Sequence, residues 1–383
     1  MNNFWEKLEK PFFVLAPMAN VTDAAFRRVI AKYGRPDVMW TEFVSCDGLC
    51  HPDGREAIRI DLSYTEEERP IVAQVFTAHP DKMREAAKYI LELGFDGIDI
   101  NMGCPDKNVM KQGAGASLMK NPELAKELVL AAKEGVENKI PVSVKTRIGF
   151  YSAVLDDWLP SLIMAKPAAI TVHARTKKEM SLVPANWDRV KRAVEIAQGS
   201  GVLILGNGDV KNLEEARARV AETGCDGVMI GRGIFGNPWL FADVARVRRG
   251  CHIEHPAASS PSGEDEIIDI KNTSKSIASQ SRNRPNTLLS GECDAEKSIG
   301  EDGAGYIPMK EVTTEEKLRV MVEHTKLYEE LFKDKKSFEL MKKHYKAYIH
   351  GFPEAKELRV KLMNCHTALE VEKATEEFLK KSF

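Results

Sequence analysis

The sequence predicts an α/β fold, a (β/α)₈ barrel followed by a small C-terminal helical bundle. Short apolar runs typical of strands recur along about the first 230 residues, with amphipathic stretches of helical spacing between several of them. Strands that alternate with helices pair in parallel through right-handed crossovers. Eight such units in this length fit one closed barrel, and 383 residues suit a large barrel plus a smaller domain.

Eight strands are expected, each a short and mostly apolar run of the kind that a parallel sheet buries on both faces. A doubly wound open sheet is the alternative, but it usually has a glycine-rich turn after its first strand, whereas Ala16-Pro17-Met18 follows here. The clearest helices are Pro80–Leu93, Pro122–Glu137 and Trp187–Gln198. The predicted strands are Phe12–Leu15, Val38–Thr41, Ile71–Phe76, Gly97–Asn101, Val142–Lys145, Ala169–His173, Val202–Gly206 and Gly227–Ile230.

The segment from residue 249 to residue 309 is polar and lacks periodicity. Its residues 252–309 carry ten acidic and five basic side chains, so the rest of the chain has a balance of +3 although the whole has −2. A structureless stretch of this length is unusual inside a compact domain and indicates a linker. The predicted parts are therefore a barrel at residues 1–248, an acidic low-complexity insertion at 249–309 and a helical domain at 310–383.

The C-terminal part is predicted to be helical, because its apolar residues recur with helical spacing. Short connections between such helices are typical of a small bundle. The predicted helices are Thr313–Phe332, Ser337–His350, Glu354–Met363 and Ala368–Lys381, with a break at Gly351-Phe352-Pro353.

Composition adds a few limits. Hydrophobic residues make up 43% and charged residues 29%, as in an ordinary globular protein. No apolar run approaches the roughly 20 residues that span a bilayer, and the N-terminus lacks a signal-peptide pattern, so a cytoplasmic protein without membrane contact is expected. The seven cysteines lack the spacing of a disulfide framework. Cys46, Cys50 and His51 lie close together, but no second ligand pair follows, so no metal is expected.

Polar residues gather at the ends of the predicted strands. In a (β/α)₈ barrel the catalytic residues lie at these C-terminal ends, so the pattern predicts one site at the mouth. The polar ends are Gln74 in the third strand, Asp99 to Pro105 at the fourth, Lys145-Thr146-Arg147 at the fifth, His173-Ala174-Arg175 at the sixth, Gly206-Asn207-Gly208-Asp209 at the seventh and Gly231-Arg232-Gly233 at the eighth.

The last two loops predict a phosphate site, because barrel enzymes often bind phosphate after strands seven and eight. Glycines there let backbone N–H groups approach phosphate oxygens, and Arg232 adds positive charge. Tight turns that need glycine are the alternative for either loop alone. Beside a flavin ring, Lys145 would stabilise negative charge at N1 and O2. His173 would hydrogen-bond a cofactor, or it is a core histidine satisfied by a backbone carbonyl.

Cys104 stands in a Gly-Cys-Pro turn just past the fourth strand, over the predicted mouth. A free cysteine is more often a small buried hydrophobe than a catalyst. At this place, however, a thiol with a pKa of about 8.5 would be mostly protonated at neutral pH and able to donate a proton.

With these motifs in place, the sequence resembles the tRNA-dihydrouridine synthases over roughly residues 11–240 and again in the C-terminal helices. Ala174 departs from the pattern, because many members carry glycine there, and the acidic insertion is not typical. The motifs that carry the resemblance are Ala16-Pro17-Met18 with Thr22-Asp23, Thr41-Glu42, Asn101 to Pro105 with Val109, Gly113 to Met119, Val144 to Gly149, Val172 to Thr176, Gly206 to Asp209, Gly231-Arg232-Gly233 with Gly236 to Trp239, Lys342-Lys343-His344, Gly351-Phe352-Pro353 and Lys356 to Arg359.

The resemblance implies FMN as prosthetic group, NADPH as reductant and tRNA as substrate. Hydride from flavin N5 would add at C6 of a uracil ring, and Cys104 would act as the general acid that protonates C5. The implied cofactor contacts are Pro17, Met18, Ala19, Gln74, Lys145, His173, Asn207, Gly208, Asp209, Gly231 and Arg232.

A paired and stacked uridine cannot reach such a pocket, so the target is expected in a loop or flipped out. Residues expected to hold the base or nearby phosphates are Asn101, Arg147 and Arg175 in the barrel, and Lys342, Lys343 and Arg359, together with Lys346 and Lys361, in the helices. Tyr345 and Tyr348 would pack against sugar or base, with a solvated helix face and core tyrosines as the alternative. A monomer is expected.

Two other functions stay open at this point. An FMN-dependent barrel oxidoreductase acting on a small pyrimidine-like substrate would share the phosphate loops, but it would not need a basic helical domain. A tRNA-binding or RNA-chaperone protein with a structural flavin would tolerate loss of Cys104.

Overall fold

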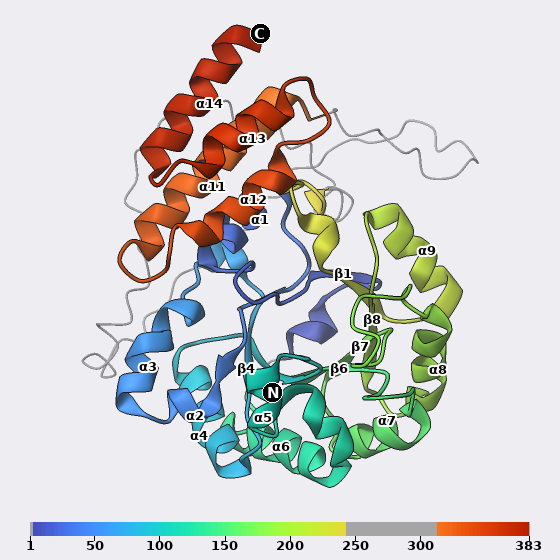
Figure 1. The fold of residues 1–383 in the computed structure, drawn as a ribbon. Helices are drawn as coiled ribbons and strands as arrows, with labels where there is room; N and C mark the ends of the chain where they lie inside the picture. The colour runs from blue at the N-terminus through green and yellow to red at the C-terminus, as the bar shows by residue number, and fades with distance from the viewer. Residues whose placement is uncertain (1–2, 243–311, 383) are drawn as a thin grey trace, which may run out of the picture. The chain divides into compact units, whose positions relative to one another are not determined.

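The chain forms a closed parallel barrel followed by helices, as the alternating pattern predicts (Figure 1). The computed structural model describes residues 3–242 and 312–382, so the predicted insertion at 249–309 lies outside the described residues. The barrel strands in the described part are β1 (Phe12–Leu15), β2 (Met39–Trp40), β4 (Ile71–Phe76), β5 (Gly97–Met102), β6 (Val142–Arg147), β7 (Ala169–His173), β8 (Leu203–Asn207) and β9 (Gly227–Ile230).

All neighbouring strands are parallel, in the order β1-β9-β8-β7-β6-β5-β4-β2. Backbone hydrogen bonds close the ring between the first two strands, because Leu15 N donates to Val38 O (3.2 Å) and Asp37 N donates to Phe13 O (3.0 Å). The predicted (β/α)₈ barrel is therefore confirmed. The second strand is shorter than expected. After it, β3 (Val44–Ser45) pairs with the later residues of β4.

Helices cover the outside of the barrel, and their starts follow from local sequence. Asp23, Asn121 and Asn212 accept hydrogen bonds from the first turn of α1, α6 and α9, as N-cap residues do. Proline occupies the first turn of α4 and α6. The helices are α1 (Ala24–Gly34), α2 (Cys46–Leu49), α3 (Pro52–Ile58), α4 (Pro80–Glu92), α5 (Lys107–Lys111), α6 (Pro122–Gly135), α7 (Leu155–Met164), α8 (Trp187–Ala197) and α9 (Leu213–Thr223), with 3₁₀ turns η1 (Phe4–Lys7), η2 (Arg59–Leu62), η3 (Glu66–Glu68), η4 (Gly115–Lys120) and η5 (Arg232–Ile234).

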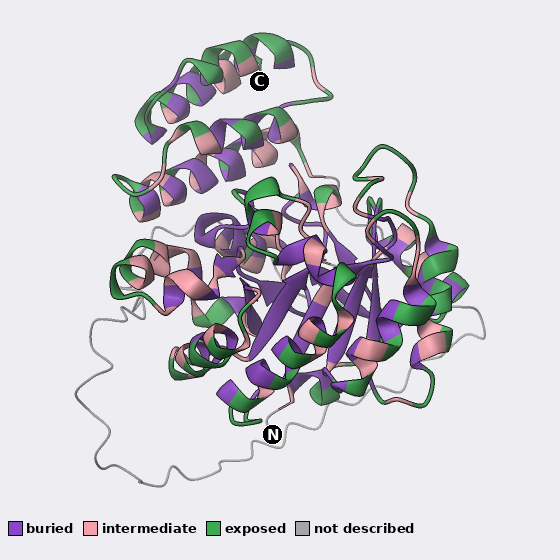
Figure 2. Ribbon diagram, turned by 60° about the horizontal axis from the view of Figure 1, so that its bottom comes forward, coloured by how far each residue is buried: buried purple, intermediate pink, exposed green. Residues whose placement is uncertain are grey.

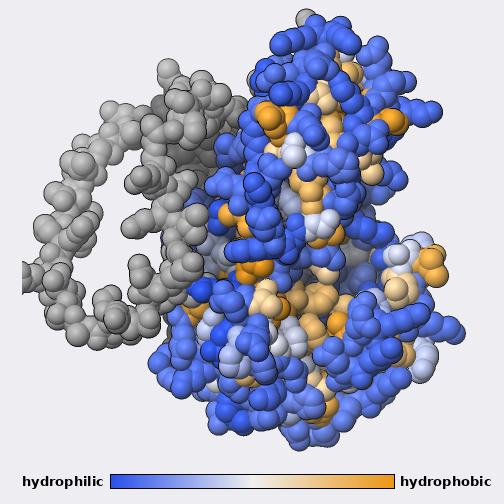
Figure 3. Space-filling model, turned by 60° about the vertical axis from the view of Figure 1, so that its left-hand side comes forward, coloured by the Kyte–Doolittle hydropathy of each residue, from blue (hydrophilic) through white to orange (hydrophobic). Residues whose placement is uncertain are grey.

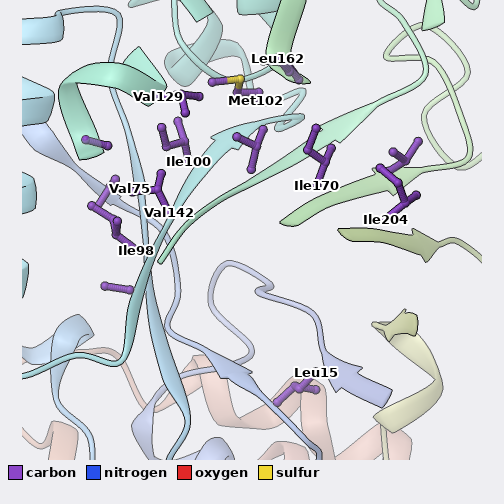
Figure 4. Packing of buried hydrophobic residues seen from close by; sticks show 14 of the residues in the cluster. Leu15, Val75, Ile98, Ile100, Met102, Val129, Val142, Leu162, Ile170 and Ile204 are labelled. Atoms are coloured by element: carbon purple, nitrogen blue, oxygen red, sulfur yellow. The ribbon is translucent and has the colours of Figure 1, made fainter. Parts of the chain in front are cut away.

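The core lies mainly between the strands and the surrounding helices, and the strands are buried along their length (Figure 2). Ile98 and Ile100 of β5 face Val129 of α6, whereas Ile170 and Ile204 continue the same layer on β7 and β8 (Figure 4). Alternate residues of the strands point into the barrel. A second apolar cluster, which includes Phe4, Trp5, Phe12, Trp40, Leu205 and Met229, fills part of the barrel interior and holds η1 against it.

Four helices follow in the described C-terminal residues, within two residues of the predicted ends. They are α11 (Thr314–Phe332), α12 (Glu339–Tyr348), α13 (Ala355–Met363) and α14 (Ala368–Ser382). A capping box at Thr313 and Glu316 starts α11, and α14 packs against both α11 and α13. On the face drawn in Figure 3 the surface is mostly hydrophilic. No helix in the described part of the chain is long and apolar enough to cross a bilayer.

Ion pairs join the C-terminal helices to the barrel. Glu323 of α11 accepts from Lys32 Nζ (2.7 Å) and Tyr33 OH (2.6 Å) of α1. Lys336, which follows α11, lies 2.9 Å from a carboxylate oxygen of Glu42 and is also paired with Asp61. Both Lys336 and Glu42 are largely shielded from solvent, so screening by salt is weaker for this pair than for a surface pair.

Two buried histidines lie at the same junction. The rings of His324 and His344 are 4.8 Å apart, and each lies near the ring of Phe26, at 5.6 and 5.4 Å. His324 is fully buried, and neither of its ring nitrogens has a hydrogen-bond partner among the described residues. Burial lowers the pKa of His324 to about 3 and holds the pKa of His344 well below its usual value.

We expect this pair to make the protein sensitive to mild acid. Below the ordinary histidine pKa of about 6.5 the unfolded chain binds protons that the folded chain rejects, so stability is lost as the pH falls. Between pH 7.5 and pH 5.5, the free energy of unfolding should fall by about 1 kcal/mol less in His324→Leu than in wild type. Urea unfolding at the two pH values measures it, with His366→Leu, at an exposed histidine, as control. Equal losses in wild type and His324→Leu would contradict this account.

Candidate active site

A cavity of about 360 Å³ opens at the C-terminal ends of the barrel strands, within the size range of small-molecule sites. It brings together Cys104, all the predicted cofactor residues except Ala19, and the predicted barrel contacts Asn101, Arg147 and Arg175. Ala19 lies exposed beside it. The lining residues are Ala16, Pro17, Met18, Phe43, Gln74, Asn101, Gly103, Cys104, Pro105, Lys145, Arg147, His173, Arg175, Met180, Ser181, Asn207, Gly208, Asp209, Val210, Met229, Gly231 and Arg232.

The lining carries more positive than negative charge. Lys145, Arg147, Arg175 and Arg232 face the cavity, and Asp209 is the one carboxylate in its lining. Because burying unbalanced charge is costly, such an excess of cations points to an anionic occupant.

Asp209 organises the loop that follows β8. Its carboxylate pairs with Arg175, accepts from Arg232 Nη2 (2.9 Å) and accepts from Ala185 N (2.9 Å). Its backbone is in the left-handed region, at φ 54°, next to Gly208 at φ 138°, so the loop turns sharply here. The hydrogen bond from Arg175 is the main reason that the pKa of Asp209 is lowered, and the carboxylate stays ionised.

Lys145 and His173 lie on neighbouring strands, and the positive charge of Arg147 acts on both. Lys145 Nζ donates to Asn207 Oδ1 (3.3 Å), and burial followed by the charge of Arg147 lowers its pKa to about 8. Burial and the nearby cations lower the pKa of His173 well below its usual range, so the ring is neutral. Arg175 Nη1 lies 3.3 Å from His173 Nε2. A guanidinium only donates, so Nε2 accepts and the proton is on Nδ1.

A chain of buried amides forms the floor beneath the mouth. Gln74 Nε2 donates to Asp99 Oδ2 (2.7 Å), and Asn101 Nδ2 donates to Gln74 Oε1 (3.2 Å). Ser143 Oγ also donates to Asp99 (2.6 Å). Burial raises the pKa of Asp99 to about 6, with these hydrogen bonds opposing the rise.

The turn that carries Cys104 is held from both sides. Asn101 Oδ1 accepts from Gly103 N (3.1 Å) and Cys104 N (2.9 Å), while Arg147 Nε donates to Gly103 O (2.8 Å). Cys104 O accepts from Ala116 N (3.0 Å) at the start of η4. Burial raises the pKa of the thiol, which therefore stays protonated at neutral pH and can act as an acid but not as a thiolate nucleophile.

The predicted contacts in the C-terminal helices are placed differently from one another. Lys343 is exposed and Arg359 is partly exposed, but Lys342 is only 4% exposed and its Nζ lies 2.6 Å from Glu339. Lys346 is exposed, and Lys361 pairs with Glu377. Tyr345 and Tyr348 are buried in the helical core, so the alternative of core tyrosines is the correct one and packing against RNA is wrong for them.

The cysteines near residue 50 form no metal centre in the described chain. Cys46 is buried, and Cys50 Sγ lies 3.5 Å from the carbonyl oxygen of Lys82. Among residues 3–242 and 312–382, no group of three or more His, Cys, Asp or Glu side chains is placed to hold a metal ion.

Several lining residues were absent from the prediction. Phe43 lies between β2 and β3, whereas Met180 and Ser181 lie in the loop after β7 and Val210 follows β8. Loop residues lack the periodicity that locates strands and helices, so no sequence signal singled them out. Asp99 stands at a predicted strand end, and the sequence pattern assigns it no role.

Together, the fold and this mouth are those of a barrel enzyme with a cationic cavity beside a protonated thiol. The chain belongs to the dihydrouridine synthase family, whose model, "Dihydrouridine synthase (Dus)", matches residues 14–282. The expected family and its class, oxidoreductase, are thereby confirmed.

Curated relatives share this assignment. The chain is 33% identical over 380 residues to "Probable tRNA-dihydrouridine synthase" of Staphylococcus aureus (strain COL), which covers 98% of this chain and 95% of the relative. It is 44% identical over 243 residues to "Probable tRNA-dihydrouridine synthase 2" of Bacillus subtilis (strain 168), which covers 62% of this chain and 74% of the relative. A solved histamine dehydrogenase from Rhizobium sp. 4-9 aligns at a TM-score of 0.47 and 15% identity over 62% of this chain and 45% of that one.

Proposed function

We propose that this protein is an FMN-dependent tRNA-dihydrouridine synthase that uses NADPH to reduce the C5=C6 bond of selected uridines in tRNA. The observation that carries the proposal is the juxtaposition of four cations and the protonated Cys104 in one mouth of a dihydrouridine synthase barrel. The names of the relatives over nearly the whole chain support tRNA as the substrate.

The residues of the mouth fit FMN. A phosphate would lie against the loops after β8 and β9, where Gly208, Asp209, Gly231 and Arg232 offer backbone N–H groups and charge. Lys145 and His173 would contact the ring system, and Met18 would supply part of an apolar wall. The other proposed contacts are Pro17, Ala19, Gln74 and Asn207. When bound, FMN would carry electrons from NADPH and supply a hydride to C6 of the uracil ring.

The chain itself supplies the proton. Hydride addition at C6 leaves negative charge across C5 and O4, and Cys104 holds a proton at the edge of the cavity for C5. Asn101 and Arg147 fix the turn around Cys104, so the thiol is oriented before the base arrives. Arg147 and Arg175 would also hold the base or a neighbouring phosphate.

We assign the barrel, residues 1–248, to catalysis and residues 310–383 to tRNA binding, with 249–309 as the insertion between them. Lys343 and Arg359 are accessible for phosphate contacts, whereas Lys342 would have to leave Glu339 to make one. The protein is proposed to act as a cytoplasmic monomer.

A visible absorption spectrum under anaerobic conditions tests the proposal. Purified protein should show flavin bands that bleach with NADPH and return on adding unmodified tRNA, but not free uridine. Bound flavin that tRNA fails to reoxidise would favour the small-molecule oxidoreductase. A colourless protein that FMN cannot reconstitute would contradict the phosphate site.

A further inference from the structure

Two loops that follow the C-terminal ends of β6 and β7 contain side chains that the proposed chemistry does not use. They are the β6–α7 loop (residues 148–154) and the β7–α8 loop (residues 174–186). Lys177 N donates to Gly149 O (2.9 Å), and a second backbone bond of the same length joins the next residue of each loop. The β7–α8 loop also reaches the cavity, where Met180 forms part of the lining. The β7–α8 loop therefore forms part of the wall of the mouth, and the β6–α7 loop is tied to it by these backbone bonds without lining the cavity itself.

Tyr151 is the most exposed aromatic side chain on these two loops, at 68%. Its ring is nevertheless held, because it meets the ring of Phe150 edge-on at 4.7 Å. Lys120 Nζ lies 3.9 Å from the centre of the Phe150 ring and 5.2 Å from that of Tyr151, and Lys177 Nζ lies 5.1 Å from Phe150. These contacts order Tyr151 while leaving most of it open to solvent.

One of these cations, Lys120, connects the two rings to the catalytic turn. Lys120 is the last residue of η4, and Ala116 of η4 donates to the carbonyl of Cys104. The lysine that lies over both rings thus belongs to the segment that supports Cys104. Tyr151 is consequently positioned relative to the Cys104 turn through a short series of direct contacts.

Apolar and basic side chains extend this surface. Leu182 is 84% exposed, Met180 and Val183 are also exposed, and the exposed Lys178 lies beside Lys177. Isolated exposed apolar residues are ordinary, but a group of them beside a cavity usually marks a binding surface. Aromatic rings next to lysines suit single-stranded nucleic acid, because bases stack on the rings and phosphates pair with the cations.

We propose that Tyr151 is a stacking platform for the nucleobase next to the target uridine, with Lys120 and Lys177 at the adjoining phosphates. The inference rests on the proposed function and extends it to substrate positioning. A uridine that enters the cavity leaves its neighbour without a stacking partner, and a ring at the rim supplies one. Stacking on an aromatic side chain contributes between about 5-fold and about 150-fold in affinity per base.

Kinetics on unmodified tRNA transcripts test the proposal. Tyr151→Ala should lower kcat/KM for dihydrouridine formation by about 5-fold to 150-fold, chiefly through KM, whereas Tyr151→Phe keeps the ring and should stay close to wild type. Met164→Ala, at a residue of α7 with 67% exposure, is the matched control and should change nothing. Flavin content and the rate of bleaching by NADPH should be the same in all four proteins.

Crosslinking gives a readout independent of turnover. A photoreactive aromatic amino acid at position 151 should crosslink to a nucleotide within about two positions of the uridine that becomes dihydrouridine. These flanking nucleotides are the ones held next to the cavity when the uridine is inside it. If wild type is active and Tyr151→Ala has the same kcat/KM, the stacking role is overturned but the proposed function is not. A crosslink to a distant part of the tRNA would have the same consequence. Absence of dihydrouridine from every tRNA treated with wild type would instead overturn the proposed function.

Discussion

Cys104→Ala should lower the rate of dihydrouridine formation by about 100-fold to 10,000-fold, the contribution typical of a positioned general acid. Its backbone is held by Asn101 and by Ala116, so the turn should survive loss of the thiol. Bleaching of the flavin by NADPH should be unchanged, because that step needs no proton from Cys104. Mass spectrometry of digested tRNA measures the first quantity and stopped-flow absorbance the second.

The matched control is Cys50→Ala, at another partly exposed free cysteine away from the cavity. It should retain full activity. The acid must be protonated, so Cys104 should support activity through neutral pH and lose this role as the pH rises through its raised pKa. Full dihydrouridine formation by Cys104→Ala would remove the general acid from the proposal and reopen a structural role for the flavin.

Gly236→Ala should destabilise the protein by more than about 2 kcal/mol. Gly236 has φ 70°, a conformation that costs an L residue about 1–2 kcal/mol. In addition, a Cβ at this position would lie 1.9 Å from the carbonyl oxygen of Ala347 in α12, a contact that only backbone movement can relieve. The contact joins the chain after η5 to the C-terminal helices, so the substitution should weaken the packing of these helices against the barrel.

Gly351→Ala separates the two causes. Gly351 has φ 80°, but an added Cβ would meet no atom within 4 Å, so only the backbone penalty of about 1–2 kcal/mol applies. Urea unfolding of both variants gives the comparison. If Gly236→Ala proves no less stable than Gly351→Ala, α12 does not rest tightly on this segment.

Barrel strands were predictable because each is a buried apolar run with polar residues at one end. Strands such as Phe12–Leu15 and Gly227–Ile230 occur at their predicted bounds, whereas β3 was missed because two residues carry no period. The site followed from the same rule, since parallel strands place their C-terminal ends together.

What the sequence did not reveal depends on packing between distant segments. Lys342 is a lysine on a helix, which favours exposure, yet the phase of α12 against its neighbours turns it inward. His324 and His344 are twenty residues apart in sequence and become neighbours only when α11 and α12 pack together. The rim residues Tyr151 and Met180 depend on the paths of two loops, and no periodic pattern encodes such a path.

The amide chain beneath the mouth also has a direction. At neutral pH Asp99 can only accept, which turns the nitrogen of Gln74 towards it and the oxygen of Gln74 towards Asn101. The same logic turns the oxygen of Asn101 towards the two N–H groups of the catalytic turn. One negative charge at the base of the mouth thus sets the orientation of both amides in this chain. An asparagine at position 99 would have nearly the same shape, but its amide can both donate and accept. The side chains of Gln74 and Asn101 could then take either orientation.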